Sequence, residues 1–270
     1  MTTKPYLIAL DLDGTLLKDD KTISAYSKEI IKKAKEAGHI VCISTGRPYR
    51  ASSMYYEELE LDTPIVNFNG AFVHHPKDDQ WGAFHTTLSL DVVKQIVEVC
   101  EKHNVNNILA EVMDHVYFHY HDEKLLDIFT MNTSDITIGD LRKNLGDDVT
   151  SILIHASEEE VDNIRNYLSD VHAELVDHRR WAAPWHVIEI IKHGMNKAVG
   201  LKKIADSYNI PAERIIAFGD EDNDLEMLKY AGQGVAMGNA IPELKKVADR
   251  ETKTNEEDGI AIYLKDTLSL

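Results

Sequence analysis

Cysteine, positive charge and long apolar segments are all scarce in this chain of 270 residues. The two cysteines, Cys42 and Cys100, each lie in an apolar stretch, which predicts buried thiols and no structural disulfide. No apolar stretch approaches the roughly 18 residues that a membrane-spanning helix needs. The first residues run into an apolar strand without the pattern of a signal peptide, so we expect a cytoplasmic protein with no membrane partner.

The shortage of positive charge restricts the possible partners further. Lysine and arginine total 29 against 46 aspartates and glutamates, which gives a formal net charge of −17. Nucleic acids and anionic membrane surfaces are bound largely through lysine and arginine, so this balance argues against both. A small phosphorylated ligand remains compatible with it, because a bound metal and local dipoles can reverse the field inside one pocket.

Short apolar stretches alternate with segments of helical period, as in βαβ units around a parallel sheet. Between residues 84 and 190 the strands look longer and more alternating, which favours an antiparallel sheet with helices on one side. We therefore predict an α/β fold in which an inserted α+β domain, residues 84–190, interrupts a Rossmann-like parallel-sheet core, residues 1–83 and 191–270. The core strands are expected at 6–10, 40–43, 64–67, 214–218 and 234–237. Helices are expected at about 24–37, with Ser24 as the N-cap, and from Pro48 to about Leu59, and Asn69-Gly70 predicts a tight turn.

Polar residues suited to phosphate chemistry follow three of these expected strands. Asp11 and Asp13 come directly after the first strand, and the sequence Ser-Thr-Gly-Arg at 44–47 follows the second. The acidic segment 219–224 follows the strand at 214–218. Because ligands of open parallel sheets bind at the carboxyl ends of the strands, we expect these segments to converge at one edge.

The aspartates of these segments suggest a metal and a reaction. Asp11 and Asp13 would repel each other unless a cation intervenes, and such a pair can provide an attacking carboxylate and a proton carrier. Mg²⁺ prefers oxygen ligands, which Asp11, Asp220 and the main-chain carbonyl of Asp13 can supply. Asp224 or Asp222 could hold metal-bound waters, although Asp222 is more typical of a helix N-cap.

Donors for a phosphate group are present beside the same strand ends. Thr45 offers a hydroxyl, and with Gly46 it offers main-chain N–H groups at a helix entrance. Lys197 begins the helix that follows the insert and can provide a point charge, while Asn223 offers an amide. Arg47 fits two interpretations equally well, a contact with substrate or a pair with a carboxylate of the core.

The chain contains four motifs, at residues 11–15, at residues 44–47, at Lys197 and at residues 219–224. In their residues and their order they resemble the motifs of the haloacid dehalogenase superfamily of phosphatases. The large insert between the second and third motifs resembles the type IIB cap of Cof-type hydrolases, which are often sugar-phosphate phosphatases. The resemblance implies Asp11 as nucleophile, Asp13 as general acid and base, and Mg²⁺ held by Asp11, Asp220 and the Asp13 carbonyl. It also implies a phosphate site formed by the Leu12 main chain, Thr45, Gly46, Lys197 and Asn223.

We therefore expect a Mg²⁺-dependent phosphatase that hydrolyses small phosphorylated metabolites, most often sugar phosphates, through an aspartyl-phosphate. The insert is expected to close over the site and to select the leaving group, and the protein is expected to be a monomer or a weak homo-oligomer. A phosphomutase of the same superfamily and a non-catalytic phosphate-binding protein are the alternatives. The motifs do not identify the substrate.

Two groups in the insert invite a functional interpretation. His115, His119 and His121 alternate along an expected strand, and a zinc site would need such a cluster together with a fourth ligand, which is not evident. We expect a solvated face there instead, with substrate contact as the alternative. Trp181 and Trp185 flank a turn near the end of the insert, where packing of the insert is expected and substrate contact is the alternative.

Overall fold

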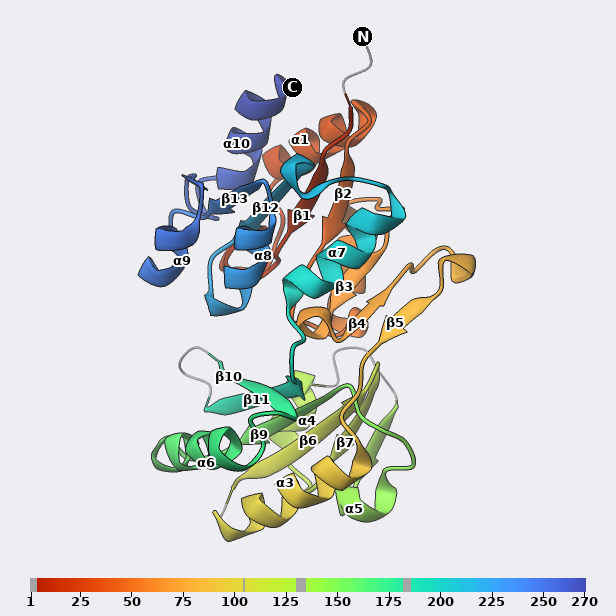
Figure 1. Cartoon of the computed structure of the whole chain (residues 1–270), viewed down its shortest axis with the longest axis vertical. Coiled ribbons are helices and arrows are strands. Elements are labelled where there is room, and N and C mark those ends of the chain that lie inside the picture. The colour runs from red at the N-terminus through yellow and green to blue at the C-terminus, as the bar shows by residue number, and fades with distance from the viewer. Residues whose placement is uncertain (1–3, 104, 130–134, 182–185) are drawn as a thin grey trace. The chain divides into compact units, whose positions relative to one another are not determined.

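The chain forms two compact units in the computed structural model, which describes residues 4–103, 105–129, 135–181 and 186–270. The first unit comprises Met1–Arg47, Ser52–Phe84 and Asn196–Leu270, and the second comprises Pro48–Ala51 and His85–Met195 (Figure 1). No helix in the described part of the chain is both long enough and apolar enough to cross a membrane.

A five-stranded parallel sheet forms the centre of the first unit. Its strands lie in the order β14-β13-β12-β1-β2, with β1 (Leu7–Leu10) between β2 (Ile40–Ile43) and β12 (Ile215–Gly219). All four residues of β1 are buried, as expected for a strand covered on both faces. The parallel α/β core predicted from the sequence is confirmed. The two remaining strands of the sheet are β13 (Gln233–Ala236) and β14 (Arg250–Glu251).

Helices connect the strands of this sheet. Helix α1 (Ala25–Glu36) begins where predicted, because the Ser24 side chain accepts a hydrogen bond from the Ser27 N–H. The C-terminal helix α10 (Gly259–Leu268), which packs against α1, was not predicted. The other helices are α2 (Ser53–Glu58), α7 (Lys197–Ser207), α8 (Leu225–Tyr230) and α9 (Pro242–Val247).

The continuous helix expected from Pro48 to Leu59 is wrong. A 3-10 turn at Tyr49–Ala51 precedes α2, and the segment Pro48–Ala51 belongs to the second unit. Arg50 explains the break, since its side chain forms a buried ion pair with Glu111 and its N–H donates to Asp114. A buried charge needs such a partner, so these contacts outweigh the continuation of the helix.

The strand expected at 64–67 does not belong to the five-stranded sheet. Strand β3 (Ile65–Asn67) forms a separate sheet with β4 (Phe72–His74) and β5 (Ala83–His85), and a parallel bridge between Ser44 and Val66 links it to the chain beyond β2. The predicted tight turn at Asn69-Gly70 is present, with φ of 50° and 96° at the two residues.

A six-stranded sheet, in the order β10-β11-β9-β6-β7-β8, forms the second unit. Its described pairs are antiparallel except for β7 and β8, which run parallel. Helices α3 (Leu90–Lys102), α5 (Leu141–Asn144) and α6 (Glu158–Val171) pack on one face. Helix α4 (Glu123–Phe129) packs on the other, so the expectation of helices on one side is wrong. The strands are β6 (Asn107–Val112), β7 (His115–Phe118), β8 (Ile136–Ile138), β9 (Ser151–His155), β10 (Val176–Arg180) and β11 (Val187–Lys192).

The three histidines do not share a solvated strand face. Strand β7 ends at Phe118, before His119 and His121. His119 is buried, and its Nδ1 atom accepts a hydrogen bond from the Leu141 N–H at 3.3 Å, so the expectation of a solvated face is wrong for this residue. His115 instead stacks on a neighbouring tyrosine of β7.

The remaining expectations for the insert and the thiols concern packing. Trp181 packs against the apolar cluster under α4, with its ring centroid 5.7 Å from that of Phe129, while Trp185 lies outside the described residues.

Cys42 and Cys100 are free and buried, as predicted. Burial raises the pKa of each thiol to about 12, so neither is an activated nucleophile.

Candidate active site

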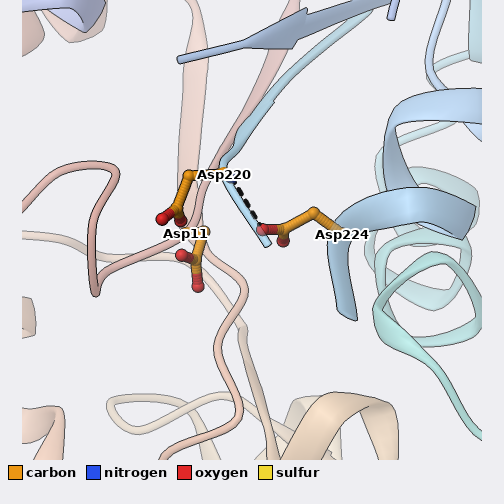
Figure 2. A group of neighbouring side chains, drawn as sticks. All are labelled: Asp11, Asp220 and Asp224. Carbon is orange, nitrogen blue, oxygen red and sulfur yellow. Dashed lines mark hydrogen bonds between the residues drawn. The ribbon is translucent and has the colours of Figure 1, made fainter. Parts of the chain in front are cut away.

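Three aspartates meet where two neighbouring strands of the first unit end. Asp11 follows β1 and Asp220 follows β12, and the two strands run parallel and in register. Asp224 reaches the same place from the turn after β12, and one carboxylate oxygen from each aspartate lies within 4.8 Å of the others (Figure 2). All three residues are buried. The convergence of Asp11 and Asp220 was expected from their positions after two strands of the sheet.

Lys197, the first residue of α7, brings a cation into this cluster. Its Nζ atom donates to Asp11 Oδ1 at 2.6 Å and to Asp224 Oδ1 at 2.7 Å, and its side chain is 0% exposed. Burial alone would lower the pKa of this amine, but Asp11 and Asp224 raise it above its ordinary value. One ammonium group therefore faces three carboxylates, which leaves a local excess of negative charge.

Asp224 is held in place by the backbone as well as by Lys197. Its Oδ2 atom accepts the N–H group of Asp220 at 3.0 Å (Figure 2). The same oxygen accepts the N–H group of Glu221 at 3.2 Å. Glu221 is the N-cap of this turn and completes a capping box, so the expectation that Asp222 is the N-cap is wrong. Gly219 is required beside it, because a Cβ atom there would lie 2.4 Å from Cγ of Asp224.

The crowding of carboxylates changes their proton affinity. Burial raises the pKa of Asp11 to about 7, against the opposing effect of Lys197. Burial and the charges of Asp11 and Asp224 raise the pKa of Asp220 to about 8. A divalent cation would offset this repulsion, and buried carboxylate oxygens are donors suited to a hard cation. The residues present therefore fit a metal site.

Asp220 is oriented by the loop that follows β1. The Thr15 hydroxyl donates to Asp220 Oδ1 at 2.9 Å. Gly14 lies so close that a Cβ atom there would be 2.1 Å from Asp220 Oδ2, and its φ of +70° also favours glycine. This role of Thr15 was not predicted, although the residue lies within the first motif.

Asp13 faces two cations. Arg47 donates from Nε to Asp13 Oδ2 at 2.6 Å and from Nη2 to Oδ1 at 2.7 Å, and Lys21 Nζ lies 2.8 Å from Oδ1. Burial alone would raise the pKa of Asp13, but Arg47 and Lys21 lower it to about 2. Of the two interpretations of Arg47, its pairing with a carboxylate is the one observed. Lys21 was missed, because a lysine in a turn carries no signal in the sequence.

Three of the five residues expected to bind phosphate are grouped around Asn69. Asn223 Nδ2 donates to Asn69 Oδ1 at 3.0 Å, and the Asn69 N–H donates to the carbonyl of Thr45 at 3.1 Å. A Cβ atom on Gly46 would lie 3.0 Å from the Asn69 side chain. Asn69 thus brings together three residues that the sequence analysis had assigned to phosphate, although its own pattern indicated a turn. Of the other two, Leu12 is buried in the loop after β1, where its carbonyl accepts the N–H of Leu17 at 2.8 Å, and Lys197 lies in the cluster of aspartates.

Two comparisons with known proteins match nearly the whole chain. A family model described as haloacid dehalogenase-like hydrolase matches residues 8–264. The 5-amino-6-(5-phospho-D-ribitylamino)uracil phosphatase YitU of Bacillus subtilis is 72% identical over 270 residues, which is the full length of both chains.

Solved structures show the same fold. A haloacid dehalogenase-like hydrolase from Bacteroides thetaiotaomicron has a TM-score of 0.85 at 27% identity, over 98% of this chain and 100% of that one. A sugar phosphatase of HAD subclass IIB has a TM-score of 0.82 over 98% of this chain and 100% of that one, and at 24% identity this likeness concerns the fold alone. The chain belongs to the haloacid dehalogenase-like hydrolase family and is a phosphatase of that family.

Proposed function

We propose that the chain hydrolyses 5-amino-6-(5-phospho-D-ribitylamino)uracil with Mg²⁺ as cofactor, through an aspartyl-phosphate formed on Asp11. The identity of 72% along the full length of a phosphatase with that substrate in its name supports the choice of substrate. The metal-dependent attack by Asp11 is supported by one observation above all, the buried cluster of Asp11, Asp220 and Asp224 around Lys197.

The metal would be held by the carboxylates of Asp11 and Asp220 and by the main-chain carbonyl of Asp13. When bound, Mg²⁺ supplies positive charge that lets a carboxylate approach an anionic phosphoryl group. Asp224 is not assigned as a metal ligand, because both of its oxygens already accept hydrogen bonds, one from Lys197 and the other from the backbone. It supports the site by holding Lys197 beside Asp11. Selection of the uracil and ribityl groups is assigned to the second unit, as the specificity domain.

The reaction follows from the residues of the first unit. Asp11 forms a bond to phosphorus as the bond from phosphorus to the ribityl oxygen breaks, and Asp13 gives that oxygen a proton. Asp13 then takes a proton from a water molecule, which attacks phosphorus and releases Asp11 and inorganic phosphate. Arg47 and Lys21 hold Asp13 ionised, which is the form that accepts this proton. In the first step Asp13 must carry a proton, so Arg47 and Lys21 have to move away from it and the carboxylate has to take up a proton from solvent before giving one to the ribityl oxygen.

Assays of phosphate release from a panel of phosphorylated metabolites test this proposal. We expect the proposed substrate to be hydrolysed with a kcat/KM roughly 100-fold or more above those of hexose phosphates and pyridoxal phosphate, because a site that hydrogen-bonds the uracil ring rejects analogues without it. EDTA should abolish the activity, and added Mg²⁺ should restore it. A preferred hexose phosphate would refute the substrate, full activity in EDTA would refute the metal, and an isomerised product without free phosphate would indicate a phosphomutase.

Mg²⁺ binding is expected to strengthen as the pH rises from about 6 to about 8. The raised pKa values of Asp11, about 7, and Asp220, about 8, mean that the metal displaces protons over this range. For the same reason, the metal-free protein should lose stability as the pH rises from about 4 to about 8, because the folded state binds more protons than the unfolded state. Calorimetric titration with Mg²⁺ in two buffers of different ionisation enthalpy measures the released protons. Asp220→Asn should reduce their number, and a pH-independent affinity would contradict the prediction.

A further inference from the structure

Asn239 lies in the turn that follows β13, and its side chain reaches the neighbouring strand end. The turn is fixed there, since the Ile241 N–H donates to the Asp220 carbonyl at 2.9 Å. The Nδ2 atom of Asn239 donates to the Gly14 carbonyl at 2.8 Å and lies 3.5 Å from Asp220 Oδ2. One amide group therefore contacts both the loop after β1 and the carboxylate after β12.

The oxygen of the same amide connects to a second asparagine. Asn239 Oδ1 accepts the N–H of Asn255 at 3.1 Å. Asn255 is buried, and its Nδ2 atom donates to the Leu17 carbonyl at 3.0 Å and to Asp19 Oδ1 at 3.3 Å. The two asparagines thus contact both ends of the segment 14–19, which holds the loop after β1 against the end of β12.

This loop carries one of the proposed metal ligands. The Asp13 carbonyl lies in the peptide before Gly14 and the Gly14 carbonyl in the peptide after it, so a hydrogen bond to the Gly14 carbonyl restrains the backbone next to the Asp13 carbonyl. Asp220 is constrained from two directions, because Thr15 donates to Oδ1 and the amide of Asn239 lies beside Oδ2. The relative position of the Asp13 carbonyl and the Asp220 carboxylate therefore depends on the contacts of Asn239 to Gly14, the residue after Asp13, and to Asp220.

We propose that Asn239 is a positioning residue of the metal site, which holds the Gly14 peptide and the Asp220 carboxylate in the arrangement that binds Mg²⁺. This inference rests on the proposed function. A neutral amide suits the position, since it donates hydrogen bonds without adding negative charge beside three carboxylates. Asn255 supports Asn239 by fixing the orientation of its amide.

Direct measurement of Mg²⁺ binding to the full chain tests the role of Asn239. Asn239→Ala is expected to raise the Kd for Mg²⁺ about 3- to 10-fold in calorimetric titration at pH 8, the effect of losing one hydrogen bond. Activity lost at limiting Mg²⁺ should return in large part when Mg²⁺ is raised. Since Asn239 is exposed, the melting temperature without metal should change by less than about 3 °C.

Asn163→Ala is the matched control, because this exposed asparagine lies in α6 of the second unit. It should bind Mg²⁺ with the wild-type Kd. A wild-type Kd for Asn239→Ala would overturn the proposal, as would an equal change in both variants. If Asn239→Ala does not fold, Asn239→Ser replaces it with the same expected rise in Kd, and a wild-type value overturns the proposal. Absence of Mg²⁺ binding by the wild-type protein would refute the proposed function itself.

Discussion

Replacement of Asp11 by asparagine is expected to lower turnover of every phosphate ester by about 10⁴-fold or more, while the chain still folds. The amide has no anionic oxygen to attack phosphorus, so no aspartyl-phosphate can form. The variant also removes one of three crowded carboxylates, and burial already disfavours the charge on Asp11. Stability of the metal-free protein at pH 8 should therefore not fall, and the loss of turnover can be attributed to chemistry.

Phosphate release measures the loss of turnover, and intact-protein mass spectrometry measures the phosphoryl group that the protein carries. Wild-type protein quenched during turnover should carry one phosphoryl group on Asp11, and Asp11→Asn should carry none. Asp91→Asn is the matched control, because the Asp91 side chain is 86% exposed in the first turn of α3. Near-normal activity of Asp11→Asn, or a phosphoryl group on another residue, would contradict the proposed nucleophile.

The features that could be predicted from the sequence are those set by local patterns. Apolar strands of four or five residues followed directly by Asp11 and Asp220 indicate a parallel sheet with polar strand ends, because side chains of buried parallel strands are apolar throughout. The start of α1 was equally local, since Ser24 and Ser27 are three residues apart.

The features that could not be predicted depend on contacts between distant segments. Thr15 meets Asp220 across 205 residues of sequence, and Asn239 meets Gly14 across 225. Thr15 and Asn239 each lie in a turn, where hydroxyl and amide side chains are common because they can hydrogen-bond the nearby backbone. The same holds for Arg50, whose buried pair with Glu111 decides where the 3-10 turn ends. A pattern read over ten residues contains no information on such pairs.

Lys197 should be the side chain on which both stability and activity depend most. In Lys197→Met, a side chain of similar length leaves Asp11 and Asp224 buried without a cation, and breaking such a pair costs about 3–5 kcal/mol of unfolding free energy. Because the lysine pKa is raised above its ordinary 10.5, the stabilisation that comes from its own protonation is lost only when the pH rises above that value. Loss of this donor on Asp11 should also reduce kcat by about 10²- to 10³-fold.

Urea unfolding of Lys197→Met at pH 6 and pH 8, with and without Mg²⁺, distinguishes two contributions of Lys197 to the free energy of unfolding, that of its charge and that of its packing. The loss of stability should be smaller at pH 6, where the unpaired carboxylates take up protons, and Mg²⁺ should recover part of it at pH 8 by supplying the missing positive charge. Lys202→Met is the matched control, since this exposed lysine of the same helix pairs with Asp206 on the surface and should change little. An equal loss at both pH values, unaffected by Mg²⁺, would mean that Lys197 acts by filling space. The excess negative charge of the three carboxylates would then not be the reason that the site binds a metal.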